Sequence, residues 1–432
     1  MKKILFILYT CCILSFPVSA QQIPSFKAND RIVFLGNSIT EGGHYHSYIW
    51  LYYMTHFPNL PLRMYNGGIG GDCVSHMVYR FDSDIKIKKP TYLICSFGMN
   101  DSGFDGYNKP GYDKYANQQV EYAHTEFEKL QRQILADKKI KSVVLLGSPP
   151  YDENVKLKGV EVLHGKNETI KRIIEMQAEV AQKRGWGFVN FNTVMCGLNK
   201  QIQLSDSTAT FCGGDRIHPD KDGHMVMAYL FLKAQGLAGQ EIASFQINAT
   251  NRKAMEERNC RISHIKNEND TISFRYLSRS LPFPIDTIPR WGTKGTARDA
   301  IRQIPFMQEM NQEIMKVTDL HGIFRVTIDG IEIGCWSGDE LSKGVNLAEI
   351  SCTPQYQQSL SIMYLNEERC AIEKRLRQYM AMQYVFFKHR GLLFADNKAA
   401  LDAAKAERES HYLVKYLYTN YTQAMFPQIR EA

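Results

Sequence analysis

Short apolar runs alternate with longer helical patterns from about residue 28 to residue 237. The apolar runs cover residues 32–35, 62–65, 92–97, 143–146 and 188–191. The helical patterns cover residues 48–57, 74–85, 115–137, 167–184 and 222–235. Strands that alternate with helices in this way typically form a mostly parallel sheet with helices on both faces. The pattern therefore predicts an α/β fold for residues 28–237.

The pattern changes after residue 239. Residues 324–333 alternate apolar and polar side chains on either side of Asp329 and Gly330, which predicts a β-hairpin. Ser337 and Glu340 then fit a capping box at the start of a short helix. Gly344 fits the end of that helix.

Further strands are expected at residues 245–247 and 272–276, and long helices at 354–387 and 397–425. Residues 240–432 are thus predicted to form a small β unit with helices around it. The simpler interpretation is a packed accessory region. The alternative is a region that shapes the substrate crevice.

Residues 1–20 have the layout of a cleavable secretory signal. Two lysines precede an apolar segment that ends in the small residues Val18, Ser19 and Ala20. The segment is short and interrupted for a membrane-spanning helix, which makes a membrane anchor the weaker alternative. We expect cleavage after Ala20, export to the periplasm or beyond, and no stable membrane insertion.

Charge and cysteine content narrow the class of partners. The formal net charge is +7 over 432 residues, and no basic stripe interleaved with aromatic residues is present. Nucleic-acid binding is therefore not expected. Among the cysteines outside the signal, Cys95 is expected to be a buried thiol, whereas Cys196 and Cys212 can close a loop. No CxxC pair indicates structural zinc, and neither a metal nor another cofactor is expected.

Polar groups and glycines follow the predicted strands at regular places. Ser38 follows the first apolar run, Gly71 follows the second, and Asn100 follows the third; Asp215 and His218 follow the last. The loops after parallel strands open at the same edge of a sheet. These five residues can therefore meet in one crevice.

Such a group has the chemistry for acyl transfer. Ser38 would be the nucleophile, His218 its base, and Asp215 the residue that orients the base. A spacing of three residues would put Asp215 and His218 on one side of a helical turn. The backbone amides of Ser38 and Gly71 and the side chain of Asn100 would form the oxyanion hole.

Each residue also has a plainer interpretation when taken alone. Ser38 can be a turn residue, Asn100 a cap, and His218 a partly buried histidine before a proline. The glycines around Gly71 lack the spacing of a phosphate-binding loop. The order of all these groups along the chain favours the catalytic interpretation.

Four short blocks carry a family resemblance: GNSIT with Ser38, NGGIGGD with Gly71, GMND with Asn100, and DRIHP with Asp215 and His218. In these blocks the chain resembles the SGNH or GDSL-type hydrolases. The resemblance implies a three-layer α/β/α sandwich over residues 28–237, flavodoxin-like in its parallel sheet. It also implies the same triad and oxyanion donors.

One position departs from that family's pattern. Asn37 stands where the family motif has an aspartate, which is structural in the family and not part of the triad. The departure therefore leaves the expected chemistry unchanged.

The substrate is less constrained than the reaction. The family resembled includes carbohydrate acetylesterases, lipases, lysophospholipases and thioesterases. His44 and Tyr45 lie just beyond the nucleophile, where polar aromatic side chains can line a sugar-sized cleft, although a plain surface or helix-start role is the alternative for His44. We expect an exported serine esterase that hydrolyses O-acetyl esters on carbohydrate. The alternatives are a lipase or lysophospholipase, and a non-catalytic glycan-binding protein.

Overall fold

The computed structural model describes residues 23–268, 271–289 and 293–427. The predicted secretory signal at residues 1–20 lies outside these ranges. Across the described residues, no helix combines the length and the apolar character needed to cross a bilayer.

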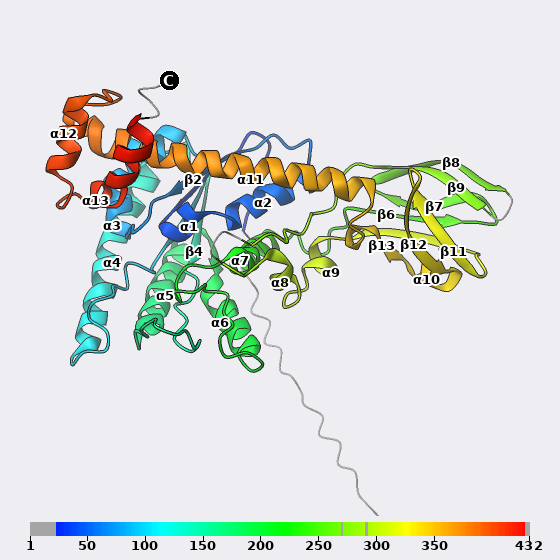
Figure 1. Cartoon of the computed structure of the whole chain (residues 1–432), viewed down its shortest axis with the longest axis horizontal. Helices are drawn as coiled ribbons and strands as arrows, with labels where there is room; N and C mark the ends of the chain where they lie inside the picture. Colours follow the sequence, from blue (N-terminus) through cyan, green and yellow to red (C-terminus); the bar gives the residue numbers. More distant parts are fainter. Residues whose placement is uncertain (1–22, 269–270, 290–292, 428–432) are drawn as a thin grey trace, which may run out of the picture.

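A five-stranded parallel sheet forms the centre of the N-terminal half (Figure 1). Its strands are β1 (Arg31–Gly36), β2 (Arg63–Gly68), β3 (Tyr92–Phe97), β4 (Ser142–Gly147) and β5 (Gly187–Asn190). They overlap all five apolar runs, so the predicted parallel sheet is confirmed. The order β2-β1-β3-β4-β5 is that of flavodoxin-like folds, in which ligands bind at the carboxyl ends of the strands beside β1.

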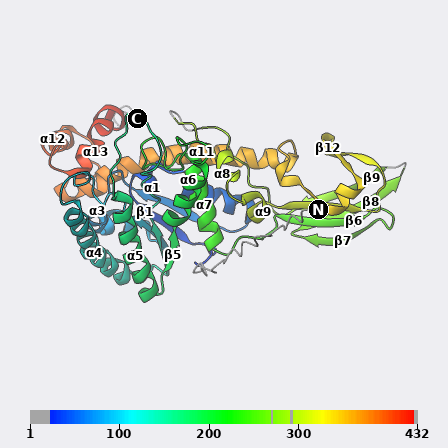
Figure 2. The ribbon, with the colours of Figure 1, turned by 90° about the horizontal axis from the view of Figure 1, so that it is seen from below.

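Helices cover both faces of this sheet (Figure 2). They are α2 (Tyr45–His56), α3 (Val74–Arg80), α4 (Tyr112–Ala136), α5 (Lys166–Arg184), α6 (Phe191–Ile202) and α7 (Lys221–Ala234). Ile32 and Phe34 of β1 pack with α2, α6 and α7, whereas Val33 and Leu35 pack with α3, α4 and α5. Because both sides of the strand are buried, every position of the run is apolar.

Two helices of this domain were not predicted. The helix α1 (Ser38–Gly42) has five residues, too few for a visible hydrophobic period, and Asn37 caps it by accepting the Ile39 N–H at 3.0 Å. The helix α6 begins at Phe191, where the sequence predicted the end of a strand. Asn190 accepts the Thr193 N–H and so starts this helix.

The β unit lies at one end of the molecule (Figure 1). Its strands are β6 (Ala243–Asn248), β7 (Lys253–Arg258), β8 (Cys260–Glu268), β9 (Thr271–Ser278), β10 (Glu313–Thr318), β11 (Ile323–Ile328), β12 (Ile331–Ser337) and β13 (Val345–Asn346). They form a four-stranded sheet, β13-β10-β6-β7, and the hairpins β8-β9 and β11-β12. The hairpin predicted around Asp329 and Gly330 is confirmed, as is the capping box of Ser337 and Glu340 that begins α10 (Gly338–Lys343).

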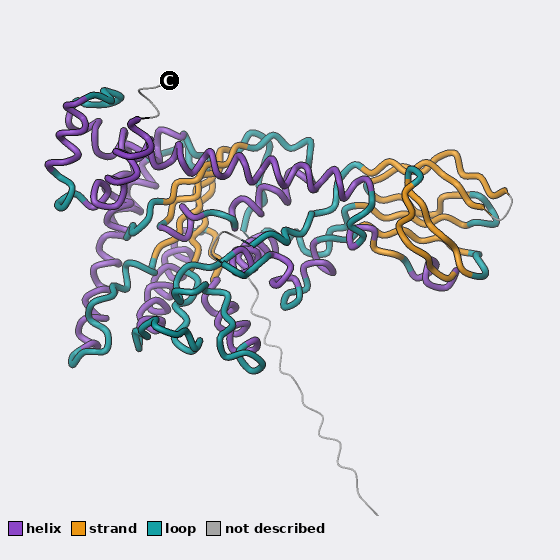
Figure 3. The backbone as a smooth tube through the Cα atoms, viewed as in Figure 1, coloured by secondary structure: helices purple, strands orange, loops and turns teal. Residues whose placement is uncertain are grey.

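The helix α11 (Pro354–Ala381) runs from the β unit across the α/β domain to α12 (Lys398–Ala406) and α13 (Tyr412–Asn420) (Figures 1 and 3). The prediction of one long helix over residues 397–425 is wrong, because the chain turns between Ala406 and Tyr412. Glu407 in this turn pairs with Arg390 through both carboxylate oxygens. The turn folds α13 back against Phe386 and its apolar neighbours.

The two halves of the chain share a core. The helices α8 (Ala297–Ile301) and α9 (Phe306–Met310) lie beyond the α/β domain in sequence. Phe283, Phe306 and Met363 nevertheless pack in the same cluster as Ile49 of α2 and Val226 of α7. The region after residue 239 therefore packs against the α/β domain through a shared core.

Candidate active site

Ser38 lies at the sharp exit from β1. This exit requires glycine at position 36. A Cβ there would lie 2.0 Å from Thr40 Oγ1 of α1, so any larger residue would clash with this helix. The chain can thus pass from strand to helix within one residue, Asn37. Ser38 is half-buried at the carboxyl edge of the sheet, and its Oγ lies 2.7 Å from His218 Nε2.

His218 is held in turn by Asp215. The distance from His218 Nδ1 to Asp215 Oδ2 is 2.5 Å, and the two side chains are 44% and 50% exposed. Asp215 Oδ1 also accepts the backbone N–H groups of Ile217 and His218, at 2.9 and 2.8 Å. Partial burial would raise the pKa of Asp215, but the bond from the His218 side chain and the two backbone donors hold it below the ordinary value.

The predicted helical turn between Asp215 and His218 is wrong. Arg216 has a φ of +70°, which no right-handed helical turn allows. Its buried guanidinium donates to the carbonyl oxygens of Asp152, Val155 and Val160 at 3.0, 2.7 and 3.3 Å. Arg216 therefore anchors the loop that carries His218. The sequence did not indicate this role, because an arginine in a polar loop is ordinarily exposed to solvent.

Gly71 occupies the third position of a tight turn after β2. The Asp72 N–H donates to the Ile69 carbonyl at 3.2 Å, and Gly71 has a φ of +78°, the conformation that a type II turn requires at this place. No atom lies within 4 Å of the place that a Gly71 side chain would occupy. The turn therefore leaves open space beside the predicted oxyanion donor.

Asn100 lies beside this turn. Its Nδ2 donates to the Asp72 carbonyl at 2.9 Å, which uses one of the two amide hydrogens and leaves the second for another acceptor. The neighbouring Asp101 accepts the N–H groups of Val74 at 2.7 Å and Gly98 at 2.8 Å. The loops after β2 and β3 are thus tied together, and Ser38, Gly71 and Asn100 all belong to loops at one sheet edge.

Lys166 of α5 binds the loop that carries Asn100. Its buried Nζ donates to the Met99 carbonyl at 2.9 Å and to Ser102 Oγ at 2.6 Å. Burial lowers the pKa of Lys166 to about 7. The sequence did not indicate this role, because a lysine in the first turn of a long amphipathic helix has the pattern of a solvent-exposed residue.

Two family models match parts of this chain. The model of the GDSL-like lipase/acylhydrolase family matches residues 34–226, and that of the diltiazem deacetylase C-terminal helical domain matches residues 360–432. The solved structure of a gut microbial diltiazem-metabolizing enzyme is 47% identical with a TM-score of 0.89, and the match covers 95% of this chain and 93% of that one. This chain belongs to the GDSL-like lipase/acylhydrolase family.

A second relative matches about half of this chain. The acetylxylan esterase of Geobacillus stearothermophilus is 23% identical over 228 residues, which cover 48% of this chain and 95% of that enzyme. Together these matches make the protein a GDSL-type esterase that acts on carboxylic esters.

The predicted substrate contacts of His44 and Tyr45 are wrong for this GDSL esterase. Tyr45 is 1% exposed, and its hydroxyl lies 3.0 Å from Thr40 Oγ1. His44 is also buried, with Nε2 3.1 Å from Glu367 of α11. His224 of α7 and Glu367 of α11 contact these rings, so other elements cover both side chains.

Cys196 and Cys212, which could close a loop, do not do so in this structure. Both are free thiols in this structure. The amide of Asn167 donates to Cys196 Sγ at 3.5 Å, and that of Asn199 donates to Cys212 Sγ at 3.3 Å. Cys95 is a fully buried thiol, as predicted.

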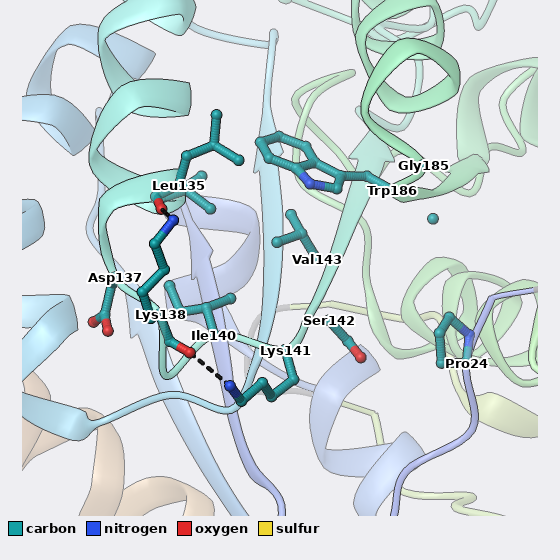
Figure 4. Close-up of a pocket in the computed structure, with 12 residues that line it drawn as sticks. Pro24, Leu135, Asp137, Lys138, Ile140, Lys141, Ser142, Val143, Gly185 and Trp186 are labelled. Carbon is teal, nitrogen blue, oxygen red and sulfur yellow. Dashed lines mark hydrogen bonds between the residues drawn. The ribbon is translucent and has the colours of Figure 1, made fainter.

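A pocket of about 380 Å³ lies at the opposite edge of the sheet, at the start of β4 (Figure 4). Ser142, Val143 and Trp186 line it, together with lysines whose Nζ atoms donate to backbone carbonyls. Because the loops that carry Ser38, Gly71 and Asn100 follow the carboxyl ends of the strands, this pocket is not part of the esterase site.

Proposed function

We propose that this esterase removes acetyl groups from small-molecule esters of bulky alcohols, with Ser38 as the nucleophile. The observation that carries the proposal is the chain of contacts from Ser38 Oγ to His218 Nε2, and from His218 Nδ1 to Asp215 Oδ2. The substrate class is supported by the 47% identity to a diltiazem-metabolizing enzyme and by the helical domain, whose family model is named for a diltiazem deacetylase.

The first half of the reaction forms an acyl-enzyme. Asp215 accepts the His218 Nδ1–H and so leaves Nε2 free to take the Ser38 proton as Oγ attacks the ester carbonyl. Negative charge then develops on the carbonyl oxygen. The N–H groups of Ser38 and Gly71 and the second amide hydrogen of Asn100 stabilise it.

The second half releases the acetyl group. His218 gives its proton to the departing alcohol oxygen, and the ester bond breaks. A water molecule then attacks the acetyl-Ser38 carbonyl while His218 takes its proton, and the same donors stabilise the second tetrahedral intermediate. Acetate leaves, and Ser38 recovers its proton from His218.

Deacetylation of carbohydrate is the second candidate, and the similarity of this chain to an acetylxylan esterase favours it. That similarity extends over 48% of the chain, whereas the match to the diltiazem-metabolizing enzyme extends over 95%. The aromatic residues predicted to contact sugar, His44 and Tyr45, are buried. We therefore rank it below small-molecule deacetylation.

The proposal is tested by comparing wild type with Ser38→Ala on diltiazem, on acetylated xylooligosaccharides, and on 4-nitrophenyl esters from acetyl to long-chain acyl. We expect acetate release from diltiazem, the highest aryl-ester rate on acetate, and a loss of about a thousandfold or more in Ser38→Ala. Ser205→Ala, a change of an exposed serine in the loop after α6, is the matched control with unchanged rates.

Other outcomes identify the alternatives. A preference for long acyl chains would make the protein a lipase, and turnover of acetylated sugars alone would make it a carbohydrate esterase. Absence of all turnover in the folded protein would favour a glycan-binding role.

Export is proposed separately from the reaction. It is supported by the signal-like pattern of residues 1–20. Sequencing of the mature N-terminus from an expressing bacterium should find Gln21 first.

A further inference from the structure

The C-terminal helical domain, residues 360–432, contacts the turn that carries the predicted oxyanion donor Gly71. The contact is made by Tyr416 of α13, and we call this turn, residues 69–72, the oxyanion loop. The ring of Tyr416 packs directly on Gly70, where a Cβ would lie 2.3 Å from the ring carbon Cζ. Only glycine at position 70 permits this approach. Gly70 is the residue before Gly71, so the ring lies against the loop that carries the donor.

A single buried carboxylate connects Tyr416 to the loop. The Tyr416 hydroxyl donates to Glu41 Oε2 at 2.6 Å, and the same oxygen accepts the Gly70 N–H at 2.9 Å. The other oxygen, Oε1, accepts from Gln378 of α11 at 3.0 Å. Glu41 is 4% exposed and belongs to α1, the helix that begins at Ser38. The nucleophile helix, the oxyanion loop and the helical domain therefore meet at one side chain.

The loop needs such a restraint. Two consecutive glycines, Gly70 and Gly71, have access to backbone conformations of either sign of φ, so their peptide group is intrinsically free to rotate. An oxyanion donor contributes only when it is already aimed at the developing charge. The turn bond between Ile69 and Asp72 holds the ends of the loop, and the bond to Glu41 fixes Gly70 within it.

We propose that Tyr416 is a positioning residue for ester hydrolysis. Through Glu41 it fixes Gly70 and thereby the direction of the Gly71 N–H. This inference rests on the proposed function of Ser38 and Gly71. It means that the helical domain completes the active site of the α/β domain, although the two lie far apart in the sequence.

The test is Tyr416→Phe in the full chain, with 4-nitrophenyl acetate as substrate. The ring stays on Gly70, and only the hydroxyl bond to Glu41 is lost. We expect kcat to fall about tenfold, less than for a lost donor, with KM within about twofold of wild type. The control is Tyr412→Phe in the same helix, whose buried hydroxyl has no hydrogen-bond partner among the described residues. It should keep the wild-type kcat.

A second comparison asks whether Tyr416 acts through Glu41. Glu41→Gln should lower kcat at least as much as Tyr416→Phe, and the double variant should be no slower than Glu41→Gln alone. Independent, multiplicative losses would overturn the inference, and so would a Tyr416→Phe enzyme with wild-type kcat or with a change confined to KM. If Ser38-dependent turnover persists in those cases, the proposed function stands and only the inference fails. Absence of Ser38-dependent turnover in wild type would overturn both.

Discussion

At the scale of single residues, the protonation of His218 should govern the rate as pH changes. The imidazole accepts the Ser38 proton only when it is neutral. Asp215 has a lowered pKa, so its carboxylate stays charged in mildly acidic solution. We expect kcat/KM to fall when the solution is made acidic enough to protonate the imidazole. A flat profile measured with 4-nitrophenyl acetate would contradict the assignment of His218 as base.

The role of Asp215 is tested by Asp215→Asn. The amide has the size of the carboxylate but stabilises neither the productive tautomer nor the imidazolium. We expect kcat to fall by about ten-thousandfold with the fold retained. A loss of less than tenfold, measured alongside an unchanged melting temperature, would remove Asp215 from the triad.

Asn100 should act on kcat more than on substrate binding. Asn100→Ala removes a donor to the developing oxyanion, so we expect kcat to fall about a hundredfold or more and KM to change little. The same side chain donates to the Asp72 carbonyl, so thermal unfolding should be followed in parallel. Asn251→Ala, in the exposed turn between β6 and β7, is the matched control. An effect limited to KM would exclude Asn100 from the oxyanion hole.

At the scale of elements, a buried ion pair fixes α11 to the α/β domain. Arg377 donates to both oxygens of Asp84, at 3.0 and 2.6 Å, and Asp84 also pairs with Arg80 and Lys88. Arg377→Ala removes two hydrogen bonds to a buried carboxylate, which keeps Arg80 and Lys88 as partners. Because a hydrogen bond to a charged group contributes about 1.5–3 kcal/mol, the free energy of unfolding in urea should fall by about 3 kcal/mol. Arg375→Ala, exposed on the same helix, should change it little.

The ion pair of Arg377 and Asp84 should make the free energy of unfolding depend on pH in acid. Burial alone would raise the pKa of Asp84, but Arg377, Lys88 and Arg80 hold it well below the ordinary value. A depressed carboxylate contributes its full stabilisation above the unfolded pKa near 4, and loses it as pH falls toward the folded pKa. The free energy of unfolding should thus decline below about pH 4. The decline should be shallower in Arg377→Ala, and an equal slope would contradict the ion-pair account.

At the scale of the whole molecule, the two halves should unfold together. Phe283 and Met363 from the second half share a core with Ile49 and Val226 from the first. A shared core couples the unfolding of the parts that bury it. Differential scanning calorimetry should show a single transition, and two separated transitions would contradict this coupling.

The sequence predicted those features of the fold and the site that depend on residues close together in the chain. The sheet, the hairpin and the meeting of Ser38 with His218 follow from apolar runs, turn residues and the loops after parallel strands. It could not predict the Tyr416 to Glu41 bond, because helical periodicity shows that a helix has a buried face but not which element covers it. The burial of Tyr45 escaped prediction for the same reason.

The exposure of His218 and Asp215 to solvent should influence which esters react fastest. Water reaches His218 and Asp215, whose side chains are about half exposed, and water weakens every electrostatic interaction that it reaches. An ester whose alcohol part spreads over these groups would expel that water itself. The leaving alcohol would then exclude water from the site during its own reaction. Hydrolysis rates should therefore increase with the surface area of the alcohol that covers His218 and Asp215, as well as with its acidity.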